Sequence, residues 1–215
     1  MHQTSDRSEG QRNMPKQTTQ EKTSKADEIL EVGQELIQTV GYDGFSYRDI
    51  ADRVGIKSAS VHYYYPAKTD LARAAARQYR EDFAVTVSEL ETEPNPFNRL
   101  VGFANIFQNT LENLNRVCLC GMLASESSSV PEEVRTEMDG FFAEQQAWIA
   151  KTIKDGIDHG TIRDETNPDG FAQTFLSALE GAMIMARSAE RPAHLAEVIE
   201  QLLALLTPVT TLEAQ

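Results

Sequence analysis

A short run of residues around position 60 carries side chains that suit contact with nucleic acid. If Val61 faces the interior of a short helix from Ser58 to about Tyr65, its neighbours turn hydroxyls, an imidazole and phenol rings outward. Such groups can reach base edges, thymine methyls and phosphate oxygens. The candidate residues are Lys57, Ser58, Ala59, Ser60, His62, Tyr63, Tyr64 and Lys68. Lys68, at the start of the next helix, would add its charge to that helix's N-terminal dipole and hold a phosphate.

The tyrosines of this run also have a second interpretation, as ordinary aromatic core residues. We expect that interpretation to hold for Tyr65, and we expect Tyr63 and His62 to be exposed. Pro66 follows directly and ends the helix.

Two short helices joined by a tight turn would position these side chains. Ser46 can cap a helix over residues 47–54, with Asp49 three residues after the cap. Ala51 is small where a second helix must cross closely, Gly55 permits the turn, and Val61 packs back on the first helix. This spacing is typical of a helix-turn-helix, whose second helix enters the major groove of DNA. Further candidates for DNA contact, at the start of the first helix, are Ser46, Tyr47 and Arg48.

Apolar residues recur at helical spacing along nearly the whole chain, which predicts an all-α fold of about nine helices. The helix that follows Lys68 spans about 24 residues, roughly 36 Å, and ends at the cluster of residues 93–96. We divide the chain into a disordered polar tail (1–23), a helix-turn-helix domain (24–80) and a second helical domain (81–215).

The net charge of −13 is unevenly distributed. Residues 76–215 hold 10 Lys+Arg and 22 Asp+Glu, whereas residues 45–80 hold 7 basic and 3 acidic residues. This predicts a basic face at one end of an acidic protein. We expect it to include Lys57, Lys68, Arg73, Arg77 and Arg80.

Several classes of protein are disfavoured by what the chain lacks. It shows no secretory signal and no apolar run of the roughly 20 residues that span a membrane, so we expect a cytoplasmic protein. It has no Gly-x-Ser-x-Gly elbow, phosphate loop or His-Glu-x-x-His motif, and its four histidines are scattered. We expect no enzyme, no cofactor and no metal site. A helical interaction module without DNA binding is a further alternative, which the basic face disfavours.

The segment from about Ser24 to Tyr79 resembles the DNA-binding domain of the tetracycline-repressor (TetR) family. The likeness lies in Gly41-Tyr42-Asp43-Gly44-Phe45-Ser46, in Ile50-Ala51-Asp52-Arg53-Val54-Gly55-Ile56, and in Tyr64-Tyr65-Pro66-Ala67-Lys68 with Leu71. It implies a homodimer that binds a palindromic operator, in most cases as a repressor, and releases it when a small molecule occupies the C-terminal domain. His62 stands where the family often has a tyrosine that contacts phosphate. In relatives, ligand binding tilts the long helix and changes the separation of the recognition helices.

The same resemblance implies a ligand cavity and a dimer interface in the C-terminal half. The residues on helices that the family arranges around its cavity are Phe103, Phe107, Met122, Phe141, Trp148, Phe175 and Met183. Any one of them could equally be a core residue; together they imply an apolar or aromatic effector. The last two helices carry Gly181, Ala182 and Ala186, which would allow close approach of a partner or close the monomer's own core. The resemblance favours the dimer.

Cys118-Leu119-Cys120-Gly121 resembles a subgroup of the family whose cysteine, here Cys118, senses electrophiles or oxidants in some members. We therefore place Cys118 among the ligand-domain candidates and keep thiol sensing as an alternative function. Cysteines two apart on a helix point about 200° apart and would not easily bond to each other. The other interpretation is a pair of buried, inert thiols.

Overall fold

Local capping signals fix where the helices begin. The Ser24 hydroxyl accepts a hydrogen bond from the Asp27 N–H at 3.2 Å, and the Asp27 carboxylate accepts one from the Ser24 N–H at 3.0 Å. Asn95 and Asn167 cap two later helices through their side-chain oxygens, each followed by a proline in the first turn. Apolar spacing and capping together therefore account for these three starting points.

The computed structural model describes residues 24–208, and over this range it contains nine helices and no strand. The helices are α1 (Lys25–Val40), α2 (Tyr47–Val54), α3 (Ser58–Tyr64), α4 (Lys68–Leu90), α5 (Pro96–Leu114), α6 (Leu119–Ser125), α7 (Glu132–Asp158), α8 (Pro168–Ser188) and α9 (Ala193–Leu206). The predicted all-α fold of about nine helices is confirmed. The expected disordered tail, residues 1–23, lies outside the described residues.

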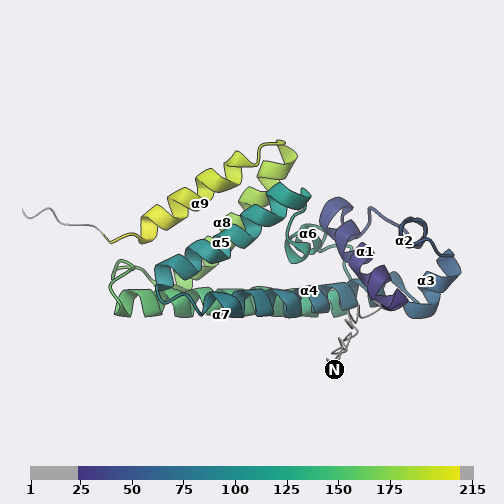
Figure 1. Cartoon of the computed structure of the whole chain (residues 1–215), viewed down its shortest axis with the longest axis horizontal. Coiled ribbons are helices and arrows are strands. Elements are labelled where there is room, and N and C mark those ends of the chain that lie inside the picture. Colours follow the sequence, from purple (N-terminus) through teal and green to yellow (C-terminus); the bar gives the residue numbers. More distant parts are fainter. Residues whose placement is uncertain (1–23, 209–215) are drawn as a thin grey trace, which may run out of the picture.

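The chain is arranged as two groups of helices that share α4 (Figure 1). Helices α1–α3 form a small group at one end, and α5–α9 form the larger group. Leu71, Ala72 and Ala75 at the start of α4 are buried beside α1, while Phe83 and Val87 are buried beside the larger group. Leu71 fits against α1 because Gly33 offers no side chain there: a Cβ on Gly33 would lie 3.2 Å from the Leu71 methyls.

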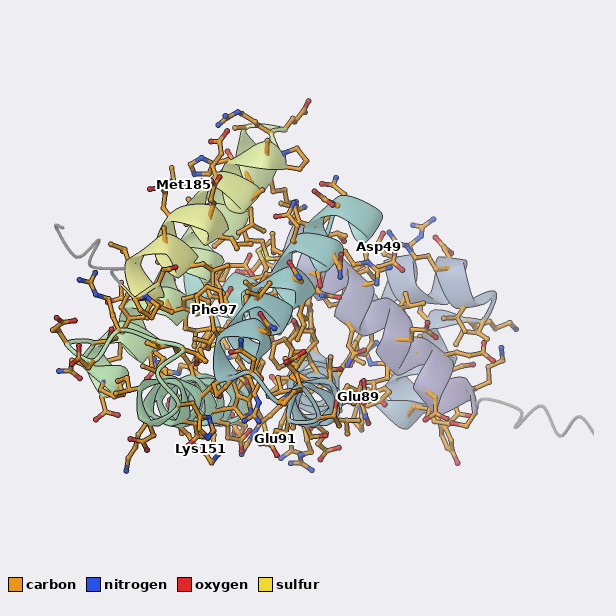
Figure 2. All side chains as sticks on the ribbon, turned by 60° about the vertical axis from the view of Figure 1, so that its left-hand side comes forward. Asp49, Glu89, Glu91, Phe97, Lys151 and Met185 are labelled. Carbon is orange, nitrogen blue, oxygen red and sulfur yellow. The ribbon has the colours of Figure 1, made fainter. Side chains whose placement is uncertain are left out.

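Helices α4 and α7 run side by side, as the view in Figure 2 shows nearly end-on. The 23 residues of α4 correspond to about 34 Å, close to the length expected from the sequence. Because one continuous helix belongs to both groups, a change in its tilt displaces helices α1–α3 relative to the larger group.

Helices α8 and α9 pack against each other and against α5, and α8 also packs against α7. Ala182 and Ala186 are buried within the single chain, so they belong to its own core. A side chain on Gly181, in contrast, would meet open space. Of the small residues expected at a dimer interface, the structure leaves only Gly181 on the outer surface.

No helix in residues 24–208 is long and apolar enough to cross a membrane.

Candidate DNA-binding face and regulatory pocket

Helices α2 and α3 form the predicted helix-turn-helix. Ile50, Ala51 and Val61 are almost fully buried between them. Gly55 ends α2 in the left-handed conformation, with φ 71° and ψ 38°, and its N–H donates to the Ala51 carbonyl. A residue with a Cβ adopts this conformation at a cost, which explains the glycine.

The outer face of α3 carries most of the predicted DNA-contact residues. Tyr63 is 80% exposed and Tyr64 41% exposed, and their rings meet edge to face at 5.2 Å. Lys57, Ala59 and His62 are also exposed, and Ser58 and Ser60 are half-buried. Tyr65 turns inward, with its hydroxyl donating to the Ala26 carbonyl at 3.4 Å. As expected, Tyr65 packs on the core while Tyr63 and His62 face outward. The helix ends one residue earlier than predicted, because Tyr65 is extended before Pro66.

Tyr47, which was expected among the DNA-contact residues, is turned inward in this structure. Tyr47 is 8% exposed, and its shielded hydroxyl has no hydrogen-bond partner among the described residues. Burial raises its pKa. The ring instead supports His62, which packs against it edge to face at 4.6 Å. The sequence placed Tyr47 at the exposed start of a helix, but the tight α2–α3 crossing covers it.

His62 uses one ring nitrogen within the protein. Its Nδ1 lies 3.3 Å from the Pro66 carbonyl, an arrangement that makes Nδ1 the donor. In a neutral imidazole Nε2 is then an acceptor and has no proton to offer a phosphate. A neutral His62 therefore does not replace the phosphate-contacting tyrosine that the family often has here.

At the start of α2, Ser46 and Arg48 are exposed, as predicted. The Ser46 N–H and hydroxyl both donate to the Asp49 carboxylate at 2.7 Å, which lowers the pKa of Asp49. Arg48 lies 3.9 Å from Asp52 in a largely exposed pair, so its guanidinium remains accessible.

The predicted basic face is smaller than the residue count implied. Arg77 pairs with Glu137 of α7 at 2.9 Å, and Arg80 pairs with both Glu137 and Glu144. These ion pairs raise the pKa of Arg80 and lower that of Glu144. Arg77 and Arg80 therefore join α4 to α7. Their partners lie about 60 residues away, beyond the reach of a local charge count.

Lys68 is also engaged within the protein. Its ammonium donates to the Phe45 carbonyl and lies over the rings of Phe45 and Tyr42, at 4.2 and 5.0 Å from the ring centroids. Burial lowers its pKa. Arg53 pairs with Glu35 at 2.8 Å. Lys57 and Arg73 are exposed and have no ion-pair partner within residues 24–208.

The larger group of helices holds the C-terminal end of α1, and we call this contact region the α1 junction. The Arg187 guanidinium of α8 donates to the carbonyls of Gln38, at 2.9 Å, and Thr39. The Gln38 side chain donates to the Val117 carbonyl at 3.1 Å. The Glu126 carboxylate, at the end of α6, accepts a hydrogen bond from the Tyr42 N–H. Residues of α8 and of the end of α6 thus hydrogen-bond to the C-terminal end of α1, the helix that packs on α2 of the helix-turn-helix.

The aromatic residues predicted to bind ligand pack against one another. The rings of Phe103, Phe107, Phe141 and Phe175 are buried. The Phe83 ring lies 5.1–6.1 Å between centroids from the first three, and Phe175 lies 6.4 Å from Phe103. Trp148 stacks on Phe103 at 5.5 Å. The other predicted residues, Cys118 and Met183, are buried and in contact through the Cys118 N–H and the Met183 sulfur, and Met122 lines a surface hollow beside Arg187.

A cavity of about 420 Å³ lies next to this aromatic cluster, between α6, α7 and α8. Its described lining contains none of the predicted ligand residues. Apolar lining comes from Gly121, Ala124, Phe142, Leu176 and Ile184, and polar lining from Ser125, Gln146, Ser177 and Glu180. No group of three or more His, Cys, Asp or Glu residues within the described range is arranged to hold a metal ion.

Comparison with known proteins agrees with this architecture. Residues 29–75 match the family described as bacterial regulatory proteins, tetR family, and residues 96–202 match the tetracyclin repressor-like C-terminal domain. A TetR-family regulator from Agrobacterium tumefaciens, known as a crystal structure, superposes with a TM-score of 0.81 at 30% identity, over 85% of this chain and 97% of that one. The chain belongs to the TetR family. Family members are DNA-binding transcriptional regulators, so this TetR-family protein is a regulator and not an enzyme.

Two characterised relatives are more distant. The HTH-type transcriptional repressor DhaR of Mycobacterium sp. (strain GP1) is 23% identical over 88% of this chain and 96% of its own. The transcriptional regulator AcuR of Cereibacter sphaeroides is 24% identical over 76% of this chain and 77% of its own. This TetR-family protein therefore matches more than three quarters of the length of both regulators.

Glu180 is the one ionisable residue in the described lining of the cavity, and the sequence analysis did not single it out. Burial raises its pKa to about 7, and a hydrogen bond from the Cys118 thiol lowers it by a smaller amount. A Cβ on Gly121 would strike the Glu180 carboxylate, so this glycine makes room for it. The sequence did contain a signal for this residue, because Glu180 is a single acid within the otherwise apolar stripe of α8.

Both cysteines of this TetR-family protein are buried, and burial raises the pKa of each thiol well above its usual range. Nearby Glu180 acts in the same direction. Reactive cysteines occur in accessible, electropositive surroundings that favour the thiolate. The environment of Cys118 is the opposite, which favours the interpretation of inert thiols over thiol sensing.

Proposed function

We propose that this protein is a ligand-responsive repressor that binds a palindromic operator as a homodimer and acts in the cytoplasm. In this proposal residues 24–80 bind DNA, and residues 81–215 bind a small effector and form the dimer. The observation that carries it is the α1 junction. Because α6 and α8 border the cavity and also hold the end of α1, a molecule that moves these helices also moves the helix-turn-helix.

The proposed DNA contacts come from the exposed part of the helix-turn-helix. Helix α3 enters the major groove with Tyr63 and Tyr64, while Lys57, Arg48 and Arg73 supply positive charge to phosphates. The half-buried hydroxyls of Ser58 and Ser60, the methyl of Ala59, the Ser46 hydroxyl and the His62 imidazole complete the proposed contact set. The Lys68 ammonium is not counted among the phosphate contacts, because the Phe45 carbonyl holds it within the protein.

The proposed dimer uses the outer faces of α8 and α9. Met185 is 60% exposed and Leu205 is 55% exposed, beside the open surface at Gly181. Figure 2 shows Met185 on the outer side of this helix pair, far from Asp49 in α2. Exposed apolar residues on two neighbouring helices suit an isologous four-helix interface.

Release from DNA follows from the geometry of a dimer on B-DNA. Two recognition helices must lie roughly 34 Å apart to enter successive major grooves. A small change in the tilt of α4, imposed by a ligand in either protomer, changes this separation and loses contacts in one half-site. The aromatic cluster behind the cavity supports the predicted apolar or aromatic character of the effector.

A protection experiment on the DNA upstream of the protein's own gene tests this proposal. The full-length protein is expected to protect a site with two-fold symmetry, with binding weakened when Tyr63 is replaced by alanine. Absence of a protected symmetric site would contradict autoregulation by operator binding. A binding stoichiometry of one protomer per site would contradict the homodimer.

A further inference from the structure

The cavity between α6, α7 and α8 combines apolar walls with one carboxyl group. Phe142, Leu176 and Ile184 contribute apolar surface, and Gln146, Ser177 and Glu180 contribute polar atoms, around a volume of about 420 Å³. This size and this mixture of lining atoms are typical of sites for small organic molecules.

Glu180 is the one ionisable group among the described lining residues of this cavity, and the Cys118 thiol is its hydrogen-bond partner. Its Oε1 atom is shielded from solvent and accepts no hydrogen bond from the residues described. The ionisable groups around the carboxyl are the thiols of Cys118 and Cys120 and the phenol of Tyr79, none of which is a cation. The guanidinium of Arg80, on α4, is paired with carboxylates of α7. The protein therefore supplies no positive charge to Glu180.

Because Oε1 is shielded in this rotamer, a ligand in the cavity reaches it only when the Glu180 side chain turns. An apolar molecule would give the carboxyl no further hydrogen bond. A neutral alcohol would supply a donor but no charge, and a carboxylic acid would repel the ionised group. An ammonium supplies both an N–H donor and a positive charge, and charge-assisted hydrogen bonds are the stronger kind. We infer that the effector is an amine with an apolar body, whose ammonium donates to Glu180 while the body packs on Phe142, Leu176 and Ile184.

This inference rests on the proposed ligand response and names the chemical class of the ligand. It also predicts a dependence of binding on pH. Since the pKa of Glu180 is raised to about 7, roughly a tenth of the carboxyls are ionised at pH 6 and roughly nine tenths at pH 8. Amine affinity is therefore expected to rise by up to about tenfold over this interval.

The test is a panel of probes added to the full-length protein: phenethylamine, 4-phenylbutylamine, hexylamine and octylamine, each with its matched alcohol and carboxylic acid. Melting temperatures and calorimetric titrations at pH 8 measure binding. At least one amine is expected to bind ten or more times more tightly than its alcohol. The proposal is wrong if every amine binds no better than its alcohol.

Two variants assign the effect to the cavity. Glu180→Gln keeps the shape of the side chain and is expected to weaken amine binding at least tenfold and to abolish its dependence on pH. Glu89→Gln removes an exposed carboxylate on α4 (Figure 2) and is expected to change neither. Equal amine affinity in wild type and Glu180→Gln would overturn the proposal. If Glu180→Gln does not fold, an amine affinity of the wild type that stays constant from pH 6 to 8 overturns it instead.

Operator binding measured without amine keeps the two proposals separate. If the ligand-free protein binds no operator, the proposed function is refuted, while amine binding through Glu180 still stands. An amine that binds through Glu180 but leaves operator affinity unchanged refutes the role of amines as effectors.

Discussion

Among the large apolar and aromatic side chains of residues 24–208, Tyr63 is the most exposed, and it lies on the outer face of α3. Tyr63→Ala is expected to weaken operator binding without changing the free energy of unfolding. A lost contact of about 1 kcal/mol in each half-site gives about 2 kcal/mol per dimer, or about 30-fold in affinity. Interferometry on immobilised operator measures it. Tyr65→Phe, which removes an inward-facing hydroxyl, serves as the control and should leave operator affinity unchanged.

Glu180 predicts an unusual relation between pH and stability. Its pKa is raised from 4.5 to about 7 in the folded protein, so the folded state holds this proton more tightly than the unfolded state. The free energy of unfolding should therefore fall by about 3 kcal/mol as pH rises from 4.5 to 7 and then level off. Urea titrations at fixed protein concentration, compared with Glu180→Gln, isolate this contribution. An identical pH dependence in both proteins would contradict it.

At the scale of elements, the turn after α1 depends on Gly41. Its φ of 83° and ψ of 174° belong to a region that is almost restricted to glycine, and a Cβ there would strike the Glu126 carboxylate. Gly41→Ala is expected to cost about 3 kcal/mol, more than Gly160→Ala, which shares a positive φ but faces open space. Denaturant unfolding measures both variants. Equal losses would show that the contact with Glu126 contributes nothing.

Helices and their local contacts were predictable from sequence, whereas pairings between distant elements were not. Residues 47–54 and the inward Val61 follow from capping and spacing within a few turns. The pairs of Arg77 and Arg80 with α7, the burial of Tyr47 and the lone carboxyl of Glu180 depend on how helices cross. The predicted aromatic residues do lie together, yet spacing alone could not show whether they surround a space or fill it.

At the scale of the whole molecule, the proposed dimer predicts a sharp effect of one charge. Met185→Glu places a carboxylate in the outer face of α8 and is expected to produce monomers that bind operator weakly. Val85→Glu is the control, because Val85 is 61% exposed on α4, away from α8 and α9. Light scattering after gel filtration gives the mass. A dimeric Met185→Glu protein would mean that the interface lies elsewhere.

The distribution of charge over the whole molecule sets the salt dependence of DNA binding. Arg48, Lys57 and Arg73 of two protomers provide six charges, which gives a slope of about −5 for log affinity against log salt. Arg73→Ala should reduce the size of this slope by about 2, whereas Arg77→Ala should leave it unchanged because Arg77 pairs with Glu137. Operator titrations at several salt concentrations provide the slopes. Similar reductions in both variants would place Arg77 on the DNA.

The single tryptophan of the chain lies where α4, α5 and α7 meet. Trp148 stacks on Phe103 with an interplanar angle of 19°, and its indole N–H donates to Glu91, just beyond the end of α4. Any change in the tilt of α4 alters the surroundings of this indole. Its intrinsic fluorescence is therefore an unlabelled optical reporter of the motion that would separate the two recognition helices, readable in real time with the unmodified protein.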